Sequence, residues 1–155
     1  MSQIASRIKE LGIELPNAAS PAANYIPFVM SDNQVVISGQ IPFWNGELIG
    51  LGKLGSNLTV EEGAKIARVC ALNLLAQLQV ASGGDLDRVS RVVKLGGFVN
   101  CIDTFTDQPE VINGASDLMV EVFGDIGRHA RFAVGVGSLP RGVAVEVDGV
   151  FELHN

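Results

Sequence analysis

The chain has 155 residues, of which 47% are hydrophobic and 18% are charged, and its formal net charge is −6. This size and hydrophobic content predict one domain with a buried core and exclude a disordered chain. The negative charge argues against broad nucleic-acid binding, which needs clustered Lys and Arg side chains.

No apolar run approaches the length of a membrane span, and the first residues lack the basic-then-apolar pattern of a signal peptide. A cytoplasmic protein without membrane partners is therefore expected. In a reducing compartment the two cysteines, Cys70 and Cys101, are expected to be buried free thiols.

The N-terminal third predicts one helix followed by a hairpin. Residues 2–11 place Ile4, Ile8 and Leu11 on one stripe, as in an amphipathic helix. Residues 28–30 and 34–39 predict two strands joined by a turn, the second with a β-branched run.

An irregular segment separates this hairpin from a second helix. Residues 42–58 contain four glycines and surround Trp44, and such long loops are often functional or cover an interface. A capping box from Thr59 to Glu62 then predicts the start of a helix that ends near residues 82–84. Small residues on its early apolar face predict close packing against a sheet.

The second half predicts a strand, a helix and a closing pair of strands. Residues 87–100 form the strand, in which Gly96 and Gly97 indicate a bulge or a close backbone approach. The helix opens with Asp107 as a capping residue and ends at Gly124. Residues 130–147 then alternate as two strands around a turn at Leu139 and Pro140.

If these two closing strands form a hairpin, Arg131 lies opposite Glu146 or one step diagonal to it, roughly 5 Å away. Both residues share a face that otherwise carries Ala and Gly. One interpretation is a solvated cross-strand salt bridge. The other is an arginine that binds a carboxylate beside an acid or base glutamate, with small residues leaving room for a ligand.

The predicted order is β-β-α-β-α-β-β, which favours an α+β fold with one sheet and both helices on one of its faces. The other face still carries apolar and small side chains. A closed homo-oligomer would cover it.

Other kinds of site have little support in the sequence. His129 and His154 are 25 positions apart and no paired cysteines accompany them, so no metal is expected. His129 follows Arg128, and a surface or supporting role is expected for it. The glycine-rich stretch 50–55 lacks the spacing of a phosphate loop.

Several motifs occur together in a characteristic order. They are Ser38-Gly39-Gln40-Ile41-Pro42, Ala130-Arg131, Leu139-Pro140, and Glu146 fifteen residues after Arg131. In this respect the chain resembles the RidA/YjgF family, also labelled L-PSP endoribonuclease, over residues 21–153. Residues 1–20 then form an N-terminal extension of a helix and a connection, and 21–155 form a single RidA/YjgF-like domain of a slightly longer subgroup.

The resemblance implies a chorismate-mutase-like fold and a homotrimer with three sites at subunit interfaces. It implies hydrolysis of 2-imino acids to 2-oxo acids and ammonia, with no metal or cofactor. Arg131 would bind the substrate carboxylate and Glu146 would activate a water. The remaining pocket residues implied are Gly39, Phe98, Asn113 and Ala133.

The chain departs from the family's imine deaminases at two positions. Ala133 stands where they usually have a cysteine, and Phe28 lies where they have a tyrosine, with Tyr25 nearby. A less polar pocket favours an alternative, a non-catalytic protein that binds a small carboxylate metabolite. A third hypothesis, an endoribonuclease, depends on the family label alone.

Overall fold

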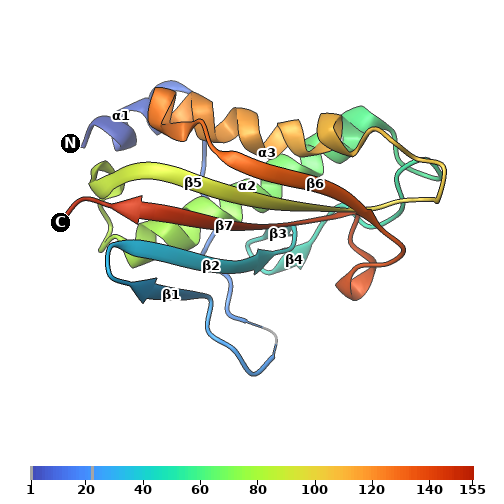
Figure 1. Ribbon diagram of the computed structural model, residues 1–155, viewed down its shortest axis with the longest axis horizontal. Coiled ribbons are helices and arrows are strands. Elements are labelled where there is room, and N and C mark those ends of the chain that lie inside the picture. Colours follow the sequence, from blue (N-terminus) through green and yellow to red (C-terminus); the bar gives the residue numbers. More distant parts are fainter. Residues whose placement is uncertain (1, 22) are drawn as a thin grey trace.

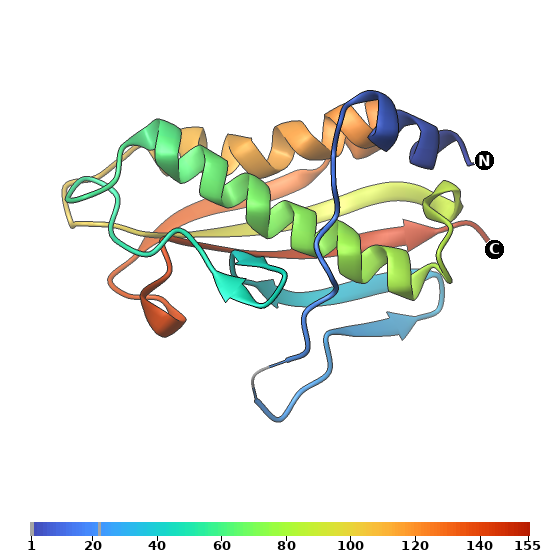
Figure 2. The same cartoon turned by 180° about the vertical axis from the view of Figure 1, so that it is seen from behind.

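The computed structural model describes residues 2–21 and 23–155, which form a mixed α+β fold with a five-stranded sheet and two long helices on one of its faces (Figures 1 and 2). The helices are α1 (Gln3–Glu10), α2 (Val60–Ala81) and α3 (Gln108–Phe123). The strands are β1 (Phe28–Ser31), β2 (Gln34–Gln40), β3 (Phe43–Trp44), β4 (Glu47–Leu48), β5 (Val89–Asn100), β6 (Ala130–Val136) and β7 (Val145–Leu153). The predicted order of elements and the predicted placement of both helices on one face are confirmed.

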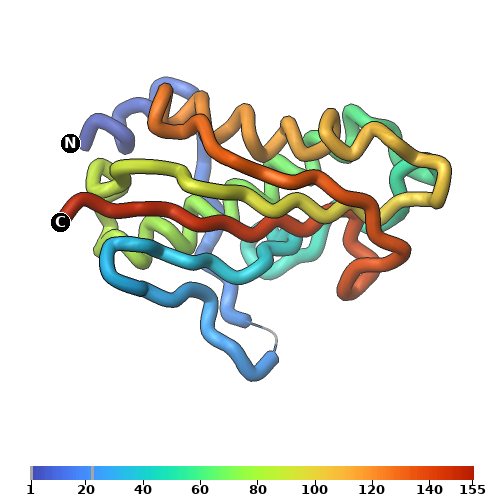
Figure 3. Tube along the Cα trace, viewed as in Figure 1, coloured from blue at the N-terminus to red at the C-terminus, as the bar shows by residue number. Residues whose placement is uncertain are grey.

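The strand order in the large sheet is β1-β2-β7-β5-β6, so β5 separates the last two strands of the chain (Figure 3). The predicted hairpin of residues 130–147 is therefore wrong. The β5–α3–β6 segment is a crossover connection, which makes β6 pair with β5 in parallel, and β7 takes the other side of β5 as an antiparallel strand. Alternation had identified both segments as strands, although β7 starts at Val145 and continues to Leu153, beyond the predicted end at residue 147. It could not say which strands are neighbours.

The core lies between the sheet and the two long helices. The capping box at the start of α2 is present: Glu62 N–H donates to Thr59 Oγ1 (3.2 Å), and Thr59 N–H donates to Glu62 Oε2 (2.8 Å). Asp107 occupies the cap position of α3, but its side chain makes no capping hydrogen bond. The largest fully buried side chains include Phe151, Ile37, Leu54, Leu74, Leu75, Leu78, Leu95, Ile112 and Leu118.

Glycines let several elements approach closely. A Cβ on Gly114 of α3 would overlap the backbone carbonyl of Ala64 on α2, so these two helices nearly touch. A Cβ on Gly97 would overlap Ile112, and one on Gly96 would overlap Asp148 and Phe132. Gly96 and Gly97 therefore mark close approaches of other side chains to β5. They do not mark a bulge, because the register shifts of β5 lie earlier in the strand, between Val89 and Lys94.

The segment before β1 crosses the helix layer, as Figure 2 shows. The α1 helix lies beside the end of α3, where Arg7 Nε donates to Glu121 O at 3.0 Å. Further along, Gln77 Nε2 on α2 donates to Ala19 O at 2.7 Å. The segment 42–58, expected to be irregular, contains the short β3–β4 hairpin, whose two-residue turn at Asn45 and Gly46 has positive φ angles.

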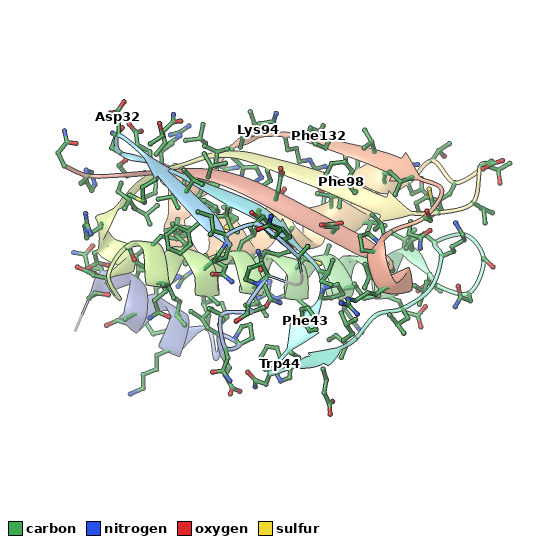
Figure 4. All side chains as sticks on the ribbon, turned by 90° about the horizontal axis from the view of Figure 1, so that it is seen from below. Asp32, Phe43, Trp44, Lys94, Phe98 and Phe132 are labelled. Atoms are coloured by element: carbon green, nitrogen blue, oxygen red, sulfur yellow. The ribbon has the colours of Figure 1, made fainter. Side chains whose placement is uncertain are left out.

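The sheet face away from the helices carries exposed apolar side chains. Val29, Val36 and Val134 remain 49%, 43% and 42% exposed. Lys94, Phe98 and Phe132 also lie on this face, on the side opposite α2 and α3 in Figure 4. We call it the open face. Among the described residues, no helix is both long and apolar enough to cross a membrane.

Candidate functional site

Arg131 lies on the helix-facing side of β6 and reaches α3. Its ladder partner is Leu95, which is fully buried beneath the helices. Its Nη1 donates to Ser116 Oγ at 3.0 Å, and its Nη2 donates to the carbonyl of Pro109 at 3.1 Å. These two bonds use two of the five N–H donors of a guanidinium. The contacts orient the planar group and leave donors for a ligand.

Two of the other predicted site residues share this edge between α3 and β6. Asn113 is exposed, three residues before Ser116 on α3, and this spacing places both on one side of the helix. Ala133 follows Arg131 by two residues, so it projects from the same face of β6, opposite Gly97 in the ladder. Arg131, Asn113 and Ala133 therefore lie on the same side of the sheet, where α3 runs beside β6, and we call them the first group.

Glu146 lies on the open face, beside the bulge of β2. The register between β2 and β7 shifts between Ile37 and Gln40, and Gly39 lies within this bulge. A Cβ on Gly39 would overlap Glu146 Oε1. The Glu146 carboxylate can occupy this position because glycine has no side chain. A cavity of about 40 Å³ adjoins the backbone of Gly39 and is also lined by Tyr25.

Phe98 completes this second group. It is the ladder partner of Glu146, and its ring contacts Phe132 edge to face, with the centroids 5.2 Å apart and an interplanar angle of 76°. Lys94 Nζ lies 5.2 Å from the Phe132 centroid, a cation–π arrangement visible in Figure 4. The second group thus consists of Gly39, Phe98 and Glu146 on the open face.

Two carboxyl groups on the open face have raised pKa values. Burial raises the pKa of Glu146, and the negative charge of Asp148 raises it further. Burial also raises the pKa of Asp148, although the Gly96 N–H and the Lys94 charge oppose this shift. A half-buried carboxylate with a raised pKa is better suited to accept a proton from water than an ordinary surface glutamate. Sequence reasoning did not identify Asp148, although it lies two residues after Glu146 on the same face.

The predicted contact between Arg131 and Glu146 is wrong for a single chain. Strand β5 lies between their strands, and the two side chains project from opposite faces of the sheet. Neither the expected cross-strand salt bridge nor a one-chain site containing both residues is present. The six predicted residues form two separate groups, one on each face.

The structure adds a hydrogen-bonded histidine to the first group. His129 Nε2 lies 2.9 Å from Ser116 Oγ, and its Nδ1 lies 2.6 Å from the carbonyl oxygen of Gly127. Burial lowers the pKa of His129, the bond to Gly127 opposes this, and the charge of Arg131 lowers it further. A serine inside a helix and a histidine before a strand have no spacing that marks them as partners in a sequence.

The two cysteines are buried free thiols, as expected. Cys70 Sγ donates to the carbonyl of Val145 at 3.4 Å, and burial raises the pKa of this thiol. Cys101 is 7% exposed and receives a weak hydrogen bond from Gln108 Nε2 at 3.7 Å. In residues 2–21 and 23–155, no group of three or more His, Cys, Asp or Glu side chains is placed to bind a metal.

Comparison with known proteins gives consistent matches over nearly the whole chain. Protein TCP17 of Trypanosoma cruzi is 53% identical over 154 residues, which cover 99% of this chain and 96% of that protein. The crystal structure of Atu1372 from Agrobacterium tumefaciens, a protein of unknown function, has a TM-score of 0.90 and 45% identity, covering 98% of this chain and 94% of that one. A structure from Shewanella oneidensis, described as a putative endoribonuclease, has a TM-score of 0.93 and 36% identity over 97% and 99% of the two chains.

Residues 5–147 match the protein family described as YjgF/chorismate mutase-like, putative endoribonuclease. This match covers both groups of site residues, and the solved structures share the sheet and helix layers that position them. The resemblance and the fold expected from the sequence motifs are confirmed. The chain belongs to the YjgF/chorismate mutase-like family.

Proposed function

We propose that this chain is a cytoplasmic, cofactor-independent deaminase that hydrolyses 2-imino acids to 2-oxo acids and ammonia. The proposal depends on the surroundings of two residues: those of Arg131 suit it to bind a carboxylate, and those of Glu146 suit it to act as a general base. Arg131 is oriented by Ser116 and Pro109 yet retains free donors. Glu146 has a raised pKa and lies against Gly39, where no side chain occupies the adjoining space.

Arg131 and Glu146 each carry out one part of the reaction. The guanidinium binds the substrate carboxylate through two parallel hydrogen bonds, which fixes the position of the neighbouring imine carbon. Glu146 accepts a proton from water as the oxygen bonds to that carbon. The imine nitrogen takes a proton from solvent, which gives a neutral carbinolamine. Glu146 then returns its proton to this nitrogen, the C–N bond breaks as the hydroxyl proton passes to solvent, and ammonia and the 2-oxo acid are released. Gly39, Phe98, Asn113 and Ala133 would shape the space around the substrate.

The site requires more than one copy of the chain, because Arg131 and Glu146 project from opposite faces of the sheet. We place the sites at the interfaces of a homotrimer, where the first group of one copy meets the second group of another. The exposed apolar residues of the open face support such an assembly, since burying them against another copy is favourable.

The test measures ammonia and oxo-acid release from freshly generated 2-iminopropanoate, corrected for spontaneous hydrolysis. The wild-type protein accelerates the reaction, and Arg131→Ala raises KM and reduces kcat/KM by roughly a hundredfold. Glu146→Gln reduces kcat, because the base is lost while the carboxylate anchor remains. Full activity in Arg131→Ala would show that the proposal is wrong.

A second candidate is a protein that binds a small carboxylate without turnover. It is favoured by Ala133, which leaves no thiol beside Arg131. This function predicts that pyruvate raises the melting temperature of the wild type but not that of Arg131→Ala, with no acceleration of imine hydrolysis. RNA cleavage, which the family description names, receives less support because the chain carries a net charge of −6.

A further inference from the structure

Ser116 and His129 form an oriented pair at the edge between α3 and β6. The carbonyl of Gly127 can only accept, so His129 Nδ1, 2.6 Å away, carries the hydrogen of the neutral imidazole. Its Nε2 is then an acceptor. Ser116 Oγ lies 2.9 Å from Nε2, and its O–H therefore donates to the ring. The histidine is held by a third group and its free lone pair is directed at a hydroxyl.

We propose that Ser116 is a nucleophile with His129 as its general base, and that the pair acts on small esters or thioesters carrying an anionic group. A hydroxyl within hydrogen-bonding reach of a base that is itself oriented by a third group is the arrangement used in nucleophilic catalysis. In this chain the backbone carbonyl of Gly127 takes the orienting role that a carboxylate often has.

Arg131 supplies the positive charge that the reaction needs. Its Nη1 donates to Ser116 Oγ at 3.0 Å, so the guanidinium stabilises negative charge developing on that oxygen and on the adjacent substrate oxygen. A cavity of about 280 Å³ opens at this point and is lined by Ser116, Asp117, Val120, Arg128, His129 and Arg131. Two arginines against one aspartate favour an anionic substrate.

The surroundings of His129 favour its neutral form. Burial lowers the pKa of His129, and the neighbouring charge of Arg131 acts in the same direction. An imidazole that stays unprotonated near neutral pH is able to take the serine proton. The sequence alone had indicated only a surface or supporting role for His129.

The reaction balances without a cofactor. Ser116 Oγ bonds to the carbonyl carbon as its proton moves to His129 Nε2, and the carbonyl electrons form an oxyanion beside Arg131. The oxyanion then collapses, the bond to the alcohol or thiol breaks, and His129 returns the proton to the leaving group. Water releases the acyl group by the same two steps, giving a carboxylic acid and free Ser116.

The first test treats the full-length protein with a fluorophosphonate probe near neutral pH and locates the adduct by peptide mass spectrometry. Ser116 is expected to be labelled, and His129→Gln slows labelling by about a hundredfold. Ser116→Ala abolishes the signal, and it preserves the fold because alanine suits a helix interior. Ser138→Ala is the matched control, an exposed serine in the turn after β6 that leaves labelling unchanged.

The second test uses Ser116→Cys, whose thiol would lie beside His129 and Arg131. Its alkylation by iodoacetamide is expected to persist to lower pH than that of Ser138→Cys, because nearby cationic and basic groups favour the thiolate. Absence of Ser116 labelling, or equal pH profiles for the two cysteine variants, overturns the proposal. Neither assay contains an imine, so the outcome is independent of the proposed deaminase activity.

Discussion

Arg131 and Glu146 lie on opposite faces of one sheet, with β5 between the strands that carry them. Each side chain has its own supporting contacts: Arg131 bonds to α3, and Glu146 lies against the bulge of β2 at Gly39. A ligand that touches both must therefore lie between two copies of the chain. The proposed deaminase reaction therefore depends on the proposed assembly.

Mixed assemblies of two inactive variants test this requirement. An Arg131→Ala copy still supplies Glu146, and a Glu146→Gln copy still supplies Arg131. Co-expressed in equal amounts, they are expected to regain about a quarter of wild-type imine hydrolysis, since each shared site draws its two groups at random. Ammonia release by the purified mixture, with its composition fixed by mass spectrometry, provides the measurement.

The control for that mixture pairs Arg131→Ala with the double variant Arg131→Ala/Glu146→Gln, in which no copy supplies the guanidinium. It should remain inactive. If the first mixture also remains inactive although both chains assemble, the two residues do not meet across an interface.

Gly39 is expected to control the position of Glu146 with little effect on stability. In Gly39→Ala, the new Cβ overlaps Glu146 Oε1, the far end of a flexible side chain that can rotate away. We expect kcat for imine hydrolysis to fall roughly tenfold to a hundredfold, because the base no longer holds the attacking water. The melting temperature should change by less than about 4 °C.

Gly137→Ala is the matched control, because a Cβ at that position meets no atom within 4 Å. Its activity and melting temperature should equal those of the wild type. If Gly39→Ala retains full kcat, the space beside Glu146 is not used in the reaction.

Local sequence patterns were enough to predict the elements of this fold. The capping box at Thr59 located the start of α2, and alternation around Phe132 and Val147 identified β6 and β7 as strands. Neither pattern contains information on which strands pair. The turn residues Leu139 and Pro140 suited a hairpin between β6 and β7. Strand β6 instead pairs with β5, to which the crossover through α3 connects it.

The candidate site was predictable only in part for the same reason. Arg131 and Glu146 were identified by motif, but their placement on opposite faces depends on the sheet order. Ser116 and His129 are thirteen positions apart and meet because α3 packs beside β6. Gly39 was expected only as a residue of the pocket, and the structure shows that its lack of a side chain leaves space for Glu146.

The contact between Gly114 and Ala64 sets the separation of α2 and α3. Gly to Ala normally stabilises a helix interior, by up to about 1 kcal/mol. In Gly114→Ala, however, the new Cβ overlaps the backbone carbonyl of Ala64, which cannot move without shifting α2. We expect a loss of roughly 2 kcal/mol or more in the free energy of unfolding, measured by urea denaturation.

Asp117→Ala provides the comparison, since it replaces an exposed residue on the same helix and should change stability by less than about 0.5 kcal/mol. A Gly114→Ala protein that is more stable than the wild type would mean that the two helices are not in contact at this position.

Asp87 holds the N-terminal helix to the domain. Its carboxylate accepts hydrogen bonds from the Gln3 and Ile4 N–H groups of α1, both at 2.8 Å, as a capping residue from another part of the chain would. The bond from Ile4 is the largest cause lowering the pKa of Asp87. Because the pKa is lower in the folded state, the stabilising contribution is present above the unfolded value of about 3.9 and disappears as the pH falls through the folded value.

We therefore expect acid to release α1 before the core unfolds, and Asp87→Asn to release it at neutral pH. Hydrogen exchange measures this directly: amides of residues 3–10 should exchange faster in the variant, while those of β7 stay protected. Asp103→Asn, an exposed loop residue, is the matched control and should leave exchange in α1 unchanged. Equal protection of α1 in wild type and Asp87→Asn would show that other contacts, such as the bond from Arg7 to Glu121, are sufficient to hold the helix.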